Sequence, residues 1–104
     1  MIKAVENNLG EIIKTCKEMQ VKSLYLFGSA TRDNEFTAKS DLDFLFQFNK
    51  GKDGLLLSKY DYFDLLFRLE EITKKKIDLV AEEKISNKYF LERVNKEKIK
   101  IYES

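Results

Sequence analysis

Two aspartates, Asp41 and Asp43 in Ser40-Asp41-Leu42-Asp43, are the residues whose type and spacing point most directly to chemistry. On an extended strand, residues two apart point to the same face, so both carboxylates would lie together at one end of a sheet. Neighbouring anions oppose each other's ionisation unless a cation or strong donors compensate. The spacing therefore favours a divalent-cation site, and the structural alternative is a turn whose side chains only bond backbone N–H groups.

A third acid, Asp78, lies between Ile77 and Leu79 in an otherwise apolar run. Burying an unpaired carboxylate is costly, so this position predicts an exposed sheet edge, a lysine partner or a cleft shared with other acids. We favour the cleft, because a strand around Asp78 would neighbour the strand that carries Asp41 and Asp43.

A phosphate-binding turn is expected just before the first two acids. The apolar run 23–27 ends at Gly28-Ser29, which is typical of a buried strand that leads into a short helix. The unpaired N–H groups at a helix N-terminus favour an anion such as phosphate. Gly28 would let the backbone approach that anion, and the Ser29 hydroxyl would add a donor.

The elements that position these residues follow from hydrophobic periodicity and from turn residues. Leu42, Phe44 and Phe46 alternate with Asp43 and Leu45, which predicts a strand with a core face and an acid-bearing face. Ser58 is expected to begin the longest helix. We expect helices over about 4–19, 58–73 and 87–98, a helical turn over about 29–33, and strands over about 23–27, 41–48 and 77–81.

This order of elements predicts an α/β (α+β) fold with a small mixed β-sheet flanked by about four helices. The chain has 104 residues, which fits a single domain over residues 1–104. Its net charge is +1, so binding to nucleic acid or to a membrane surface is not favoured. No long apolar segment marks a secretory signal or a membrane span, which predicts a cytoplasmic protein.

Residue types that are absent exclude several chemistries. The chain has no histidine, which removes histidine general bases, Ser-His-Asp triads and most zinc sites. Its one cysteine, Cys16, belongs to the apolar stripe of the first expected helix, so it is predicted to be a core residue and not a nucleophile.

Three segments taken together resemble the motifs of minimal nucleotidyltransferases of the DNA polymerase β superfamily, in their single-domain form. The resemblance covers nearly the whole chain and differs from the usual pattern at two points. Asp33 follows Arg32 where glycine is usual, and the interval from Gly-Ser to Asp-x-Asp is one residue longer than is common. The segments are Leu26-Phe27-Gly28-Ser29, Ser40-Asp41-Leu42-Asp43-Phe44-Leu45-Phe46 and Lys76-Ile77-Asp78-Leu79-Val80.

The resemblance implies transfer of a nucleoside monophosphate, AMP from ATP, to an acceptor hydroxyl, with two Mg²⁺ ions. It implies that Asp41, Asp43 and Asp78 are the catalytic and metal-binding residues. Gly28, Ser29 and Arg32 would then bind the triphosphate. Some small members of the family are antitoxins that attach AMP to a toxin of the HEPN class, which implies such a partner here.

Two other functions stay open on the sequence. A binding module could keep the fold and neutralise a partner by contact alone, although it would have no need for three acids around a phosphate-binding turn. A small-molecule nucleotidyltransferase is less favoured, because the resembling enzymes usually carry an additional helical domain to hold the acceptor.

Overall fold

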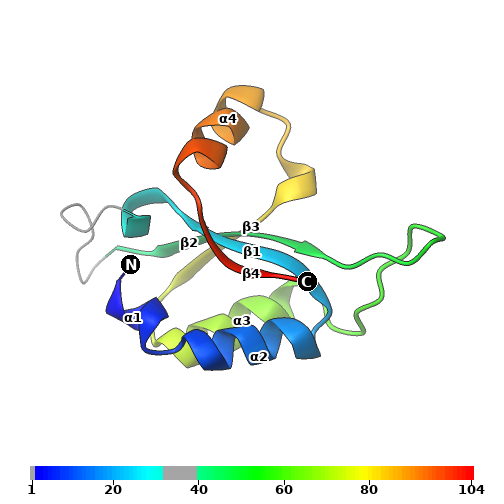
Figure 1. Ribbon diagram of the computed structural model, residues 1–104, viewed down its shortest axis with the longest axis horizontal. Helices are drawn as coiled ribbons and strands as arrows, with labels where there is room; N and C mark the ends of the chain where they lie inside the picture. Colours follow the sequence, from blue (N-terminus) through cyan, green and yellow to red (C-terminus); the bar gives the residue numbers. More distant parts are fainter. Residues whose placement is uncertain (1, 32–39) are drawn as a thin grey trace.

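A mixed sheet with strand order β3-β2-β1-β4 forms the middle of the computed structural model, which describes residues 2–31 and 40–104 (Figure 1). The central strands β1 and β2 are antiparallel, and β4 pairs antiparallel with the other edge of β1. The edge strand β3 runs parallel to β2. The bounds are β1 Val21–Phe27, β2 Leu42–Phe48, β3 Ile77–Ala81 and β4 Ile99–Glu103.

Helices cover both faces of this sheet. Three of them, α1 (Lys3–Glu6), α2 (Leu9–Glu18) and α3 (Tyr62–Thr73), lie on one face, and α4 (Lys88–Glu97) lies on the other (Figure 1). A mixed sheet flanked by four helices is the predicted architecture, and the described residues confirm it. None of the described helices is long and apolar enough to cross a membrane.

The alternation of side chains along β2 explains why the acids face α4. Leu42 and Phe44 are fully buried in the main core, which lies between the sheet and the helices α1, α2 and α3. Leu45, one residue on, is buried in a second cluster with Phe27 and Val94 of α4. Asp43 shares the face of Leu45, because residues two apart on a strand point the same way.

The first predicted helix is in fact two helices. The prediction of one helix over 4–19 is wrong, because the chain breaks at Asn7 and Asn8 between α1 and α2. The Asn8 side chain donates a hydrogen bond to the Ala4 carbonyl oxygen at 2.7 Å. Asparagine side chains compete in this way with the helical hydrogen-bond ladder, so they favour helix ends over helix interiors.

The long helix begins later than predicted. Asp61, and not Ser58, is its N-cap: an Asp61 carboxylate oxygen accepts from the Asp64 N–H at 3.0 Å, and the Asp64 carboxylate accepts from the Asp61 N–H at 2.9 Å. The Ser58 hydroxyl oxygen instead accepts from the Tyr60 N–H at 3.0 Å, within the turn that precedes the helix.

Replacing the true cap should therefore cost more than replacing the expected one. We expect Asp61→Ala to lower the free energy of unfolding by about 1 kcal/mol, because it leaves helix N–H groups without an acceptor. Ser58→Ala should cost only a few tenths of that amount. Urea unfolding of both variants measures the difference, and equal losses would contradict the assignment of the cap.

Strand β4 was not predicted, and it fixes the position of α4. The predicted helix over 87–98 corresponds to α4, with Asn87 as its N-cap, and β4 begins two residues after that helix ends. Pairing of β4 with β1 ties the C-terminal end of α4 to the sheet. The helix therefore stands over the face that carries Asp43.

Candidate active site

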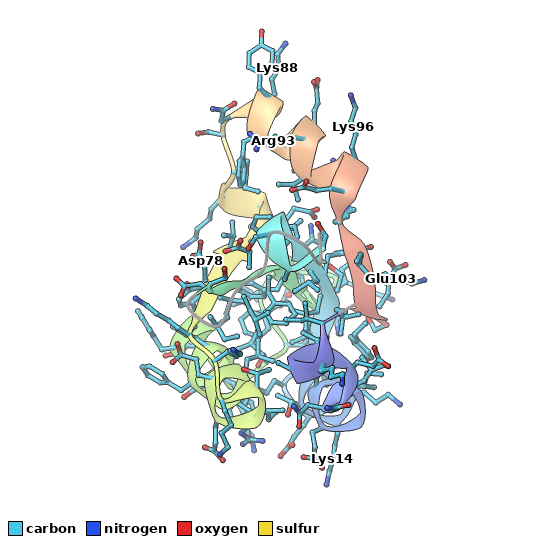
Figure 2. The ribbon with its side chains drawn as sticks, turned by 90° about the vertical axis from the view of Figure 1, so that its left-hand side faces the viewer. Lys14, Asp78, Lys88, Arg93, Lys96 and Glu103 are labelled. Carbon is cyan, nitrogen blue, oxygen red and sulfur yellow. The ribbon has the colours of Figure 1, made fainter. Side chains whose placement is uncertain are left out.

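Two of the three predicted acids lie side by side. Asp43 and Asp78 are direct partners in the parallel register of β2 and β3, and their side chains are hydrogen-bonded to each other. Figure 2 shows Asp78 on the flank of the sheet, below α4. Asp41 is exposed and precedes β2, and its charge acts on Asp43 from there. The structure thus brings Asp43 and Asp78 together and leaves Asp41 at the margin.

The negative charge of the pair Asp43 and Asp78 is not balanced by nearby positive charge, because every cause of the pKa shift at Asp43 raises that pKa. Partial burial raises the pKa of Asp43 from 3.8 to about 6, and the charge of Asp78 and the hydrogen bond with it add to the shift. Asp41 and then Glu97 make smaller contributions of the same sign. A carboxyl in this setting gains from a nearby cation, because a cation favours its ionised form.

The donor set fits a magnesium ion that is shared with a substrate. Mg²⁺ prefers oxygen ligands, and it is commonly held by one or two carboxylates together with waters and phosphate oxygens of the substrate. In the described part of the chain, no three side chains of the His, Cys, Asp or Glu type are close enough to enclose a metal by themselves. Asp43 and Asp78 match the open type of site, in which the substrate supplies the remaining ligands.

Gly28 brings the backbone against Asp43. It begins the short 3-10 turn η1 (Gly28–Thr31) directly after β1, with a φ of +73° that favours glycine. A Cβ at this position would overlap the Oδ2 atom of Asp43. The Thr31 hydroxyl donates to the Gly28 carbonyl oxygen at 2.7 Å and closes the turn.

Glu97 of α4 is a residue of the site that the sequence did not reveal. Its Oε1 atom accepts a hydrogen bond of 3.3 Å from the Gly28 N–H. The sequence predicts that this N–H donates to a phosphate, and in the structure it donates to the Glu97 carboxylate instead. The two residues are 69 positions apart, and no local pattern in the sequence relates them.

A cavity of about 310 Å³ connects these parts. It lies between the turn η1, the start of β2 and the helix α4, so the cavity reaches Asp43 from the α4 side. Figure 2 shows Arg93 on α4, which stands above the sheet. The residues that line the cavity are Phe27, Gly28, Ser29, Asp43, Phe90, Arg93, Val94 and Glu97.

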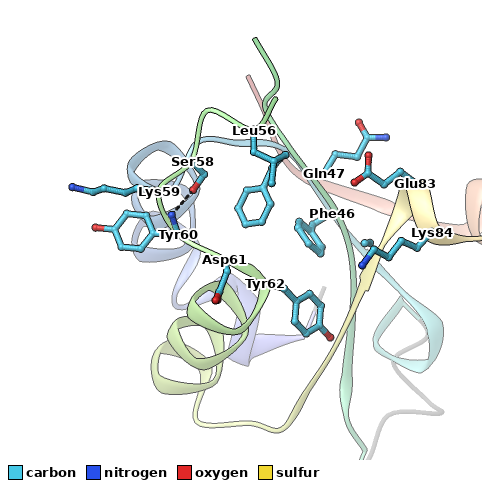
Figure 3. Close-up of a pocket in the computed structure, with 12 residues that line it drawn as sticks. Phe46, Gln47, Leu56, Ser58, Lys59, Tyr60, Asp61, Tyr62, Glu83 and Lys84 are labelled. Atoms are coloured by element: carbon cyan, nitrogen blue, oxygen red, sulfur yellow. Dashed lines mark hydrogen bonds between the residues drawn. The ribbon is translucent and has the colours of Figure 1, made fainter. Parts of the chain in front are cut away.

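A second hollow, of about 380 Å³, lies at the other end of β2 (Figure 3). Half of the residues that line it are aromatic or aliphatic, with Phe46 and Tyr62 among them. Its two acids are already engaged: Asp61 caps α3, and Glu83 pairs with Lys50 at 2.7 Å. This hollow lacks the facing carboxylates that phosphate chemistry needs.

Arg32, predicted to bind the triphosphate, lies outside the described residues. Asp33 and most of the longer interval before Asp41 lie there as well.

Comparison with known proteins identifies the family. The family described as "Polymerase beta, Nucleotidyltransferase" matches residues 10–104, and the chain belongs to it. A Methanocaldococcus jannaschii protein, named as the candidate protein adenylyltransferase MJ0128, is 34% identical over 99 residues, which cover 94% of this chain and 95% of that protein.

Solved structures agree on the fold. A protein described as a candidate minimal nucleotidyltransferase superimposes with a TM-score of 0.74 at 25% identity, covering 93% of this chain and 92% of that one. A structure described as a tri-AMPylated Shewanella oneidensis HEPN toxin in complex with MNT antitoxin matches with a TM-score of 0.61 at 18% identity. That match covers 95% of this chain and 72% of the other, and it supports the fold alone.

Proposed function

We propose that this protein transfers AMP from ATP to a hydroxyl group of a partner protein, and that the partner is a HEPN-type toxin which the modification neutralises. The observation that carries the proposal is the facing pair Asp43 and Asp78 beside the Gly28 turn, in a chain of the nucleotidyltransferase family. The name of the M. jannaschii relative supports a protein as the acceptor. The AMPylated HEPN toxin in a structure of the same fold supports the kind of partner.

In this reaction the acceptor oxygen attacks the α-phosphorus of ATP, the bond from that phosphorus to the bridging oxygen breaks, and pyrophosphate leaves. Asp41 and Asp43 would hold the metal, and Asp78 would complete the site. Bound Mg²⁺ would supply charge neutralisation on the phosphate oxygens. Asp78 would orient the acceptor hydroxyl and take its proton.

The turn after β1 would hold the triphosphate. Ser29 lines the cavity beside Asp43, and glycine at position 28 allows a phosphate to approach the backbone. Because Glu97 bonds the Gly28 N–H, a phosphate that uses this donor must displace the Glu97 carboxylate. Arg32 is proposed to assist from the following segment.

The experiment uses ATP labelled at either the α- or the γ-phosphate, with Mg²⁺ and the protein encoded by the neighbouring gene. We expect the α-label, and not the γ-label, to appear on the partner, since transfer of AMP leaves the γ-phosphate in pyrophosphate. Asp41→Asn should weaken the labelling. Tight partner binding and toxin neutralisation without any label would instead show a module that acts by contact alone.

The pH dependence of transfer should follow Asp43. Its pKa is raised to about 6, so at lower pH the carboxyl is protonated and cannot ligate a cation. At low magnesium concentration we expect the transfer rate to fall about tenfold for each pH unit below that value. A rise in magnesium concentration should move the midpoint to lower pH, because the cation competes with the proton. Initial rates between pH 5 and 8, at several magnesium concentrations, test this in a partner-labelling assay.

A further inference from the structure

Among the described residues that line the cavity beside Asp43, one has a positively charged side chain. Asp43 and Glu97 contribute acids, and Arg93 of α4 contributes the positive charge. Arg93 is exposed and has no carboxylate partner within the described part of the chain. A polyphosphate entering a site rich in carboxylates needs such a cation, because like charges otherwise oppose its binding.

Two contacts on either side of Arg93 hold it over this cavity. Glu97, four residues later on the same face of α4, bonds the Gly28 N–H at 3.3 Å. Phe90, three residues earlier, packs its ring edge-on against Phe27 of β1, with 6.0 Å between ring centroids and an interplanar angle of 82°. The helix is therefore fixed to the sheet one turn before Arg93 and one turn after it.

The residues that share the cavity indicate which part of a bound nucleotide would reach Arg93. Under the proposed function, on which this inference rests, the α-phosphate lies at Asp43 and Asp78, where the transfer occurs. Asp43, Ser29 and Arg93 all line this one cavity. A substrate that extends along it places either its outer phosphates or its nucleoside at Arg93, and the positive charge there favours the phosphates.

We propose that Arg93 binds the β- and γ-phosphates of the triphosphate, so that it also holds the pyrophosphate that leaves. The planar guanidinium donates two parallel N–H bonds to phosphate oxygens, a geometry that lysine lacks. Arg93 thereby offsets the negative charge that builds up on the bridging oxygen as the bond to the α-phosphorus breaks.

The test compares the dissociation constants of ATP and AMP, measured by isothermal titration calorimetry at one fixed magnesium concentration on the full chain. For Arg93→Gln we expect ATP binding to weaken about tenfold or more, and AMP binding to change less than about twofold. Lys96→Gln is the matched control, since Lys96 is an exposed cation on the same helix that does not line the cavity. It removes the same charge and should leave both constants unchanged.

The other possible results also support or overturn the proposed role of Arg93. Equal weakening of ATP and AMP would place the nucleoside or the α-phosphate at Arg93 and overturn the proposal, as would unchanged ATP binding. If Arg93→Gln fails to fold, Arg93→Lys serves in the same comparison, with a smaller selective loss of ATP expected. A selective loss of ATP binding in a protein that labels no partner would support the role of Arg93 and refute the proposed transfer. A wild-type protein that binds neither nucleotide would overturn both.

Discussion

Asp43→Asn should lower adenylate transfer by at least about a hundredfold and, at the same time, make the metal-free protein more stable above pH 7. The loss of activity follows from the proposed role of Asp43, because an amide is a poor substitute for a metal-binding carboxylate. The gain in stability follows from the repulsion among Asp43, Asp78 and the neighbouring acids. A residue kept for function is expected to show these opposite effects.

The sign of the stability effect follows from the pKa of Asp43, which is about 6 in the folded protein against an ordinary value of 3.8 for an aspartate. The folded state then binds this proton more tightly than the unfolded state does, so stability falls as the pH rises from about 4 through about 6. Above that range the full penalty is present, and asparagine removes it. Since solvent screens part of the repulsion, we expect a gain of about 1 kcal/mol.

Thermal unfolding in the presence of EDTA measures this effect. The melting temperature of Asp43→Asn should exceed that of the wild type by a few degrees at pH 8, and the two should agree at pH 3.5. Asp53→Asn is the control: Asp53 is exposed in the loop after β2, at the far end of that strand, and asparagine keeps the oxygen that accepts from the Leu55 N–H. A loss of stability at pH 8 in Asp43→Asn would show that the carboxylate supports the fold.

The strands that carry the acids could be predicted because their pattern is local. The alternation over 42–48 fixes which side chains enter the main core, so it also fixes the face on which Asp43 lies. An apolar run of five residues interrupted by Asp78 defines β3 in the same way. The register that pairs Asp43 with Asp78 is a property of the assembled sheet, and the sequence supplied it only through the resemblance to a family.

Strand β4 and the break between α1 and α2 were missed, although the local sequence contains a signal for each. The alternation of Ile99 and Ile101 with Lys100 and Tyr102 is a strand pattern, and it corresponds to β4. Consecutive asparagines at the break between α1 and α2 are likewise typical of a helix end. Both signals are short, and each competes with a longer helical pattern beside it.

The contribution of α4 to the site had no such signal. Glu97 and Arg93 lie in a helix whose charged residues are mostly exposed, and nothing in their spacing separates them from Lys96. They lie beside the cavity at Asp43 because β4 pairs with β1 and so carries α4 over the Gly28 turn. Contacts of this kind depend on chain topology, which a periodic pattern does not encode.

Gly28→Ala should lower transfer by about a hundredfold through a single added methyl group. The new Cβ would overlap the Oδ2 atom of Asp43 and lie 3.1 Å from its Cγ. A side-chain carboxylate can rotate away from this overlap, so the fold survives, but the rotation takes Asp43 out of its position beside Asp78. A displacement of about 1 Å in a reacting group is enough for a loss of this size.

Gly54→Ala is the matched control for backbone strain. Gly54 has a φ of +81°, close to the +73° of Gly28, and a Cβ there would meet nothing within 4 Å. Both variants should lose about 1 kcal/mol of stability from the left-handed backbone, Gly28→Ala should lose more because the Asp43 carboxylate must also rotate, and only Gly28→Ala should lose activity. Full activity in Gly28→Ala would contradict the placement of Asp43 at the reacting centre.

A double variant separates the two parts of the Gly28 effect. In an Asp43→Ala background the added methyl group meets no carboxylate, so Gly28→Ala should then cost only the backbone strain that Gly54→Ala reports. Urea unfolding of the four proteins of this cycle gives the coupling between positions 28 and 43. A coupling near zero would mean that the carboxylate moves aside at no cost in stability, and that Gly28→Ala loses stability through backbone strain alone.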